Sequence, residues 1–69
     1  MDVEEMYQSK QIIDTIKNKR LHRWLVDMWD VQHPYYMAHI HQPLLDGDLT
    51  LRDLLQLQFK YRTGGDGDE

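Results

Sequence analysis

The chain has 69 residues, no cysteine and a formal net charge of −4 at pH 7. A chain of this length forms one domain, and its small core favours support from oligomerisation or from a partner. Without cysteine, disulfide bonds and thiolate metal sites are excluded. The acidic N-terminus does not resemble a signal peptide, and no apolar run reaches the roughly 20 residues that span a bilayer. These features predict a soluble, cytoplasmic protein that has no membrane partner.

The longest helical pattern in the sequence runs from Ile12 to Val31. Its apolar residues recur at the spacing of an amphipathic helix and include Ile13, Ile16, Leu21, Trp24, Leu25, Met28 and Val31. We expect a single helix, which at 1.5 Å per residue would be roughly 30 Å long. Pro34 should stop it near Gln32 or His33, because the residue before a proline is disfavoured in the α region.

Two starting points fit this helix. Nothing between Val3 and Ile12 breaks a helix, and Glu4 and Glu5 suit an N-terminal turn. Alternatively, Ser9 caps a helix that begins after it. We favour the early start near Val3.

Two prolines bound the next segment. Pro34 suits the first position of a helix, where its missing N–H makes no hydrogen bond, and Pro43 lies on the far side. Tyr36 and Ile40 lie at helical spacing between them, so we predict a short helix and keep an extended link as the alternative. Residues 44–48, which contain an Asp-Gly pair, predict a turn.

A helix start follows this turn. Thr50 and Asp53 stand in the spacing of a capping box. Residues 55–62 then alternate apolar and polar, which is a strand pattern. Because a lone strand would have no partner in this chain, we predict a helix from residue 51 to about residue 60.

Together these elements predict an all-α fold with three helices. They are one long N-terminal helix, a short helix bounded by prolines, and a capped, Leu-rich C-terminal helix. A single domain should span residues 1–62, and residues 63–69 should form a disordered acidic tail. The sequence carries no motif that identifies a family.

The densest set of potential metal ligands is His33, His39 and His41, with four aspartates nearby in the sequence. On a helix, His39 and His41 would point about 200° apart and would share an ion only if the segment were extended. We interpret them as packing residues and predict no metal and no cofactor. No nucleophile motif is present, and a domain of this size rarely encloses a catalytic pocket, so we expect no enzymatic activity.

Basic residues concentrate in the first half of the long helix, whereas aspartates dominate from residue 27 to residue 53. The basic side chains are Lys17, Lys19, Arg20 and Arg23. They suit phosphate binding, with Trp24 or Trp29 stacking on a base. A basic run is also typical of a solvated helix face or of a contact with an acidic protein. Nucleic-acid binding is therefore our alternative hypothesis.

Aromatic and methionine side chains cluster in the same region and include Trp24, Met28, Trp29, Tyr35 and Tyr36. These types supply cores, and they are also enriched in interfaces. The long helix would have more apolar surface than two short helices can cover. We therefore predict a small non-enzymatic interaction module: an adaptor, inhibitor or assembly factor of the kind often encoded by phages and mobile elements.

This module would bind a protein partner and form a homodimer through the long helix. Trp24, Met28 and Trp29 would anchor the contact, with Tyr35 and Tyr36 beside them. Arg20 and Arg23 would set the orientation of the partner through charge.

Overall fold

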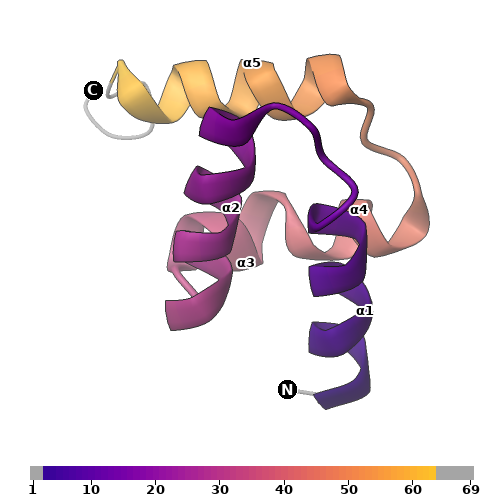
Figure 1. Ribbon diagram of the computed structural model, residues 1–69. Helices are drawn as coiled ribbons and strands as arrows, with labels where there is room; N and C mark the ends of the chain where they lie inside the picture. Colours follow the sequence, from indigo (N-terminus) through magenta and orange to yellow (C-terminus); the bar gives the residue numbers. More distant parts are fainter. Residues whose placement is uncertain (1–2, 64–69) are drawn as a thin grey trace.

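The computed structural model describes residues 3–63 and has an all-α fold, as the sequence predicts (Figure 1). No strand occurs in this range. Five helices follow one another: α1 (Val3–Ile13), α2 (Lys19–Val31), α3 (Pro34–His39), α4 (His41–Asp46) and α5 (Leu51–Arg62). The predicted disordered tail lies outside the described residues from position 64 onward.

The predicted single helix from Ile12 to Val31 is wrong, because residues 14–18 interrupt it. The Thr15 hydroxyl donates to the Ile12 carbonyl (2.7 Å), and the Asn18 side chain caps α2 by accepting from the Leu21 N–H (3.0 Å). Threonine and asparagine offer the backbone such local hydrogen bonds in place of helix continuation. The chain therefore reverses direction and α2 returns beside α1.

The other ends of α1 and α2 lie away from this reversal. The early start of α1 at Val3 is confirmed, and Ser9 is not a helix cap but a buried residue in the middle of α1. At the far end, α2 closes with Gln32 in the left-handed conformation (φ 52°), just before His33 and Pro34.

The short helix predicted between the two prolines is present as α3, with Pro34 in its first turn. Pro43 does not bound it, because Pro43 lies in the first turn of a further helix, α4, where proline is tolerated. Part of the predicted turn at 44–48 is accordingly helical. The chain turns only at Gly47, whose φ of 78° ends α4 in the left-handed region that glycine adopts easily.

The capping box predicted at the start of α5 is confirmed. The Thr50 side chain accepts from the Asp53 N–H (3.2 Å), and the Asp53 carboxylate accepts from the Thr50 N–H (3.0 Å). The alternating residues 55–62 are helical throughout.

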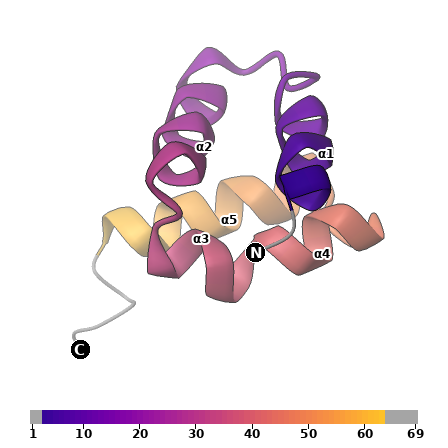
Figure 2. The ribbon, with the colours of Figure 1, turned by 90° about the horizontal axis from the view of Figure 1, so that it is seen from below.

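The five helices form three parts of the molecule. α1 and α2 lie side by side and antiparallel, α3 and α4 cross behind them in the view of Figure 1, and α5 lies across the top against α2 (Figures 1 and 2). The acidic first turn of α1 and the last turn of α2 are therefore at the same end of the molecule. The first turn of α2 is at the other end, beside α5.

Every helix contributes to one core. Its buried members are Ile13, Leu21, Leu25, Met28, Tyr35, Tyr36, Ile40, Leu44 and Leu54. Tyr36 is the largest fully buried side chain, and its burial raises the pKa of the phenol above the ordinary value of 10.0, against the opposing effect of a hydrogen bond with Ser9. Burial of these apolar side chains is the main stabilising term for the fold.

Candidate interaction surfaces

The outer face of α5 carries a row of exposed apolar side chains. Leu51, Leu55 and Phe59 are spaced four residues apart, so they lie on one side of the helix, and they are 53%, 38% and 65% exposed. We call these three residues the α5 stripe. Leu54 and Gln58, on the adjoining face of α5, are buried in the core. α5 therefore has apolar residues on two faces, and only one of them packs inside the molecule.

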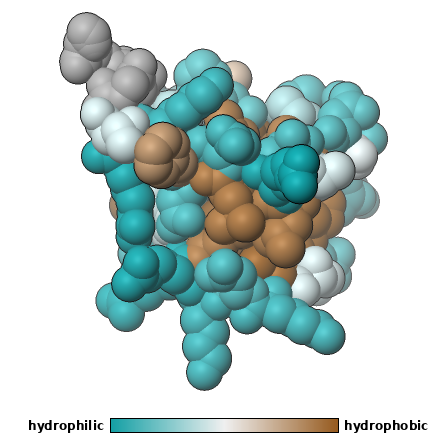
Figure 3. Space-filling model, turned by 90° about the horizontal axis from the view of Figure 1, so that it is seen from above, coloured by the Kyte–Doolittle hydropathy of each residue, from teal (hydrophilic) through white to brown (hydrophobic). Residues whose placement is uncertain are grey.

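The surface around the α5 stripe is hollowed. A groove of about 450 Å³ is lined by Arg52, Leu55, Gln56 and Phe59. Seen from the α5 side, hydrophobic residues gather in the middle of the face and hydrophilic residues surround them (Figure 3). Apolar patches with a polar rim are typical of binding sites.

Basic residues surround this face. α5 supplies Arg52, Lys60 and Arg62, and the neighbouring start of α2 and the segment before it supply Lys17, Lys19, Arg20 and Arg23. All seven are exposed, and they leave Lys10 as the one remaining lysine or arginine of the chain. α2 is held against α5 by Trp24 and Tyr61, whose ring centroids lie 5.8 Å apart. We call these seven residues the basic end.

The opposite end of the α1–α2 pair is acidic. Glu4 and Glu5 lie in the first turn of α1, and Asp30 lies in the last turn of α2. We call these three residues the acidic end. Asp27, one turn earlier in α2, forms an ion pair with Arg23 of the basic end, with 3.9 Å between the Asp27 Oδ2 and Arg23 Nε atoms. A hollow of about 300 Å³ lies here, lined by Val3, Met6, Trp29, Asp30 and Gln32. Val3 is 82% exposed at its edge.

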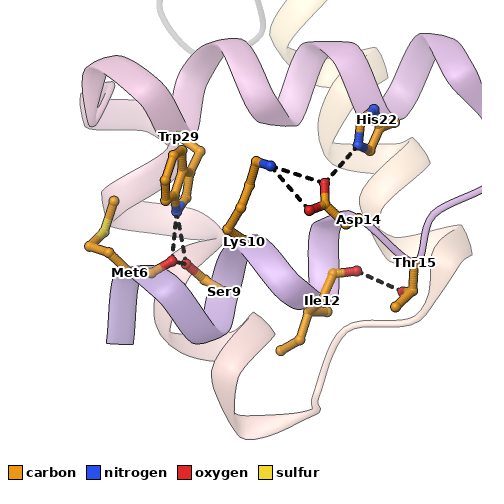
Figure 4. Close-up of polar contacts among 8 residues, drawn as sticks. All are labelled: Met6, Ser9, Lys10, Ile12, Asp14, Thr15, His22 and Trp29. Atoms are coloured by element: carbon orange, nitrogen blue, oxygen red, sulfur yellow. Dashed lines mark hydrogen bonds and ion pairs between the residues drawn. The ribbon is translucent and has the colours of Figure 1, made fainter. Parts of the chain in front are cut away.

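Trp29 of α2 forms hydrogen bonds with α1 at this end (Figure 4). Its indole N–H donates to the Met6 carbonyl and to the Ser9 hydroxyl, both at 3.0 Å, and the Ser9 hydroxyl donates to the same carbonyl at 2.8 Å. The Lys10 ammonium lies 5.8 Å from the centre of the indole ring. Trp29 is thus half-buried and bonded within the chain.

A second link between α1 and α2 is the Asp14 carboxylate, also visible in Figure 4. It accepts from His22 Nε2 at 3.1 Å and from Lys10 Nζ at 3.1 Å. Hydrogen bonding from His22, and then from Lys10, holds the pKa of Asp14 below its ordinary value of 3.8. The link lies where the chain reverses, so it helps to keep the two helices antiparallel.

The structure separates the predicted partner-binding residues into three groups. Arg20 and Arg23 are exposed, whereas Met28, Tyr35 and Tyr36 are buried in the core. Trp24 and Trp29 are half-buried between helices. An aromatic and methionine surface along one long helix does not form, because that helix is interrupted and its aromatic residues pack inward.

The sequence did not lead us to predict the α5 stripe, although residues 55–62 contain a pattern that indicates it. Strict alternation over residues 55–62 poses a choice between strand and helix. Because successive residues of a helix are about 100° apart, alternating apolar residues on a helix fall on two sides of it. The alternation therefore indicated one apolar face beyond what the core needs.

The three histidines do not converge, and no group of three metal-ligating side chains occurs among the described residues. His33 caps α3 by accepting from the Tyr35 N–H at 3.1 Å. His41 is buried, with its Nδ1 3.3 Å from the Tyr36 hydroxyl, and His39 is exposed beside the Tyr35 ring.

Comparison with protein-family models, with curated proteins and with solved structures finds no match for this chain. Within residues 3–63, no helix is both long enough and apolar enough to cross a membrane.

Proposed function

We propose that this chain is a small non-enzymatic interaction module that binds protein through the α5 stripe. The observation that supports this proposal is the exposed row Leu51, Leu55 and Phe59 on a regular, capped helix. Leaving these side chains in water forgoes the stabilisation that burial would supply. Protein partners bury such rows at interfaces, where aromatic and leucine side chains fill facing grooves.

The alternative class, an enzyme, has little support among the described residues. Each of the two hollows is open, and each includes a single charged side chain, Arg52 in one and Asp30 in the other. Acid–base or nucleophilic catalysis needs at least two positioned groups, in a site that excludes water. A role as adaptor, inhibitor or assembly factor needs only a surface.

Differential capture from the native host tests the proposal. The tagged wild-type chain is compared with Phe59→Glu and with Ala38→Glu, which makes the same charge change at an exposed position of α3. We expect bound proteins that are shared by wild type and Ala38→Glu and lost with Phe59→Glu. If all three chains retain the same proteins, while circular dichroism shows equal folding, the α5 stripe is not the binding surface.

Nucleic-acid binding is a second candidate function, because the fold gathers Lys17, Lys19, Arg20 and Arg23 beside three further basic residues of α5. The apolar centre of this face favours protein over a phosphate backbone. Binding to DNA or RNA should fall steeply as salt rises and should weaken in Arg20→Glu. Binding that is undetectable at low salt would remove this candidate.

A further inference from the structure

The charges of α2 are placed against the preference of the helix itself. Lys19 and Arg20 lie in its first turn, whereas Asp27 and Asp30 lie towards its end, and its first turn contains no acid and its last turn no base. The helix dipole favours the opposite arrangement. α1 follows the usual rule, with Glu4 and Glu5 in its first turn and Lys10 in its last. Local rules are most often broken where a residue serves a function outside its own helix.

Because α1 and α2 are antiparallel, these charges combine into two opposite ends of the molecule (Figure 1). The basic end lies beside α5, and the acidic end lies where α1 begins and α2 finishes. Each end also has exposed apolar surface. The α5 stripe lies at the basic end, and Val3 and the hollow lined in part by Trp29 lie at the acidic end.

The two ends differ in their exposed apolar features as well as in charge. Phe59 is 65% exposed and projects from α5 among Arg52, Lys60 and Arg62. The hollow at the acidic end, of about 300 Å³, combines apolar walls with the Asp30 carboxylate. Aromatic side chains commonly anchor interfaces by filling apolar recesses, and opposite charges around such an anchor favour association.

We infer that the partner bound by the α5 stripe is a second copy of this chain, which presents its acidic end. This inference rests on the proposed function. A symmetric contact of α5 with α5 would instead bring two basic ends together, and like charges facing each other disfavour association. A symmetric dimer through one helix from Ile12 to Val31 has no continuous helix to form it.

A contact between two different surfaces leaves one of each surface free in every pair. Such association is head-to-tail and continues into longer chains, or closes into a ring if the rotation allows. Association should therefore increase with protein concentration, pass beyond the dimer, and weaken with salt, because its charges are exposed.

Complementation between two blocked variants tests this arrangement. Phe59→Glu blocks the α5 stripe and leaves the acidic end intact, and Asp30→Lys does the reverse. Neither residue is buried. Each variant alone should be a monomer, whereas an equimolar mixture should form one-to-one dimers and nothing larger, as measured by light scattering behind a sizing column. Ala38→Glu should associate like wild type.

Three results would overturn the inference. They are a wild-type chain that stays monomeric into the millimolar range, a variant that associates alone like wild type, and a mixture that remains monomeric. If the wild-type chain is monomeric but loses captured proteins on Phe59→Glu, the second copy is excluded and the proposed function stands. If the captured proteins are also unchanged, both fail.

Discussion

Trp29 and Trp24 show how similar side chains can have different roles in one small domain. The Trp29 indole N–H donates two hydrogen bonds to α1. The Trp24 indole N–H is also buried, but it has no acceptor in the described part of the chain. Both rings pack between helices, so the two side chains can be compared by whether the indole N–H is hydrogen-bonded.

Replacing each tryptophan by phenylalanine should separate these roles. Trp29→Phe removes a bonded donor and should lower the free energy of unfolding by about 1–2 kcal/mol beyond the loss of ring area. Trp24→Phe removes a buried donor without a partner, so its cost should be smaller. Urea unfolding followed by circular dichroism measures both. Equal losses would mean that the Met6 and Ser9 contacts do not stabilise the fold.

The Asp14 link should make stability depend on pH in a defined direction. Its pKa is lowered in the folded state, so the carboxylate stabilises the fold above 3.8, and this contribution is lost as the pH falls through the folded value. Asp14→Asn should therefore melt below wild type at neutral pH, and the difference should vanish in acid. A difference in melting temperature that persists once carboxylates are protonated would contradict this assignment.

At the scale of the helix, two adjacent leucines of α5 lie on different faces, one buried and one exposed. Leu54 is buried, whereas its neighbour Leu55 lies in the α5 stripe. Leu54→Ala should cost about 2–5 kcal/mol, because it removes core contacts and leaves a cavity. Leu55→Ala should cost well under that amount in the monomer. Chemical unfolding of the two variants compares them directly, and a reversed order would mean that α5 is rotated.

The reversed charges of α2 lead to a prediction in which stability and association change in opposite directions. Asp30→Lys places a cation at the C-terminal end of α2 and should stabilise the monomer by about 0.3–1 kcal/mol. Glu5→Lys removes an acid from the first turn of α1 and should destabilise the monomer by a similar amount. Both should weaken self-association. If association follows monomer stability instead, these charges act within the fold and not between copies.

These helices also show which parts of the fold the sequence predicts. Thr50 and Asp53 specify a helix start through direct hydrogen bonds, and the prediction there was correct. The break at residues 14–18 was missed because the apolar spacing tolerates one longer step, from Ile16 to Leu21, and the capping role of Asn18 was not recognised. Short polar side chains determine such a break, and the spacing of the apolar residues carries no information about them.

The candidate surface was harder to predict than the fold. Aromatic and methionine residues such as Met28 and Tyr36 are typical of interfaces, but a chain of 69 residues needs them for its core. Which apolar residues remain outside depends on how the helices pack. Arg20 and Arg23 are exposed as expected. Leu51 and Phe59 are candidates because the packing of α5 buries a different face of the helix.

At the scale of the whole molecule, the antiparallel α1–α2 pair and the crossing α5 produce an asymmetric protein. One end is basic with a projecting Phe59, and the other is acidic with a hollow at Trp29. Neither feature belongs to a single helix. A domain this small gains little from its own core, so contacts between copies would add stability that depends on concentration.

The measurement that tests this account most directly is the mass of the wild-type chain in solution by sedimentation, across protein concentration and at low and high salt. We predict a weight-average mass that rises above the 8.4 kDa of one chain as concentration increases at low salt. It should return towards 8.4 kDa at high salt and in Phe59→Glu. A mass that stays at 8.4 kDa under every condition would contradict the proposed head-to-tail association.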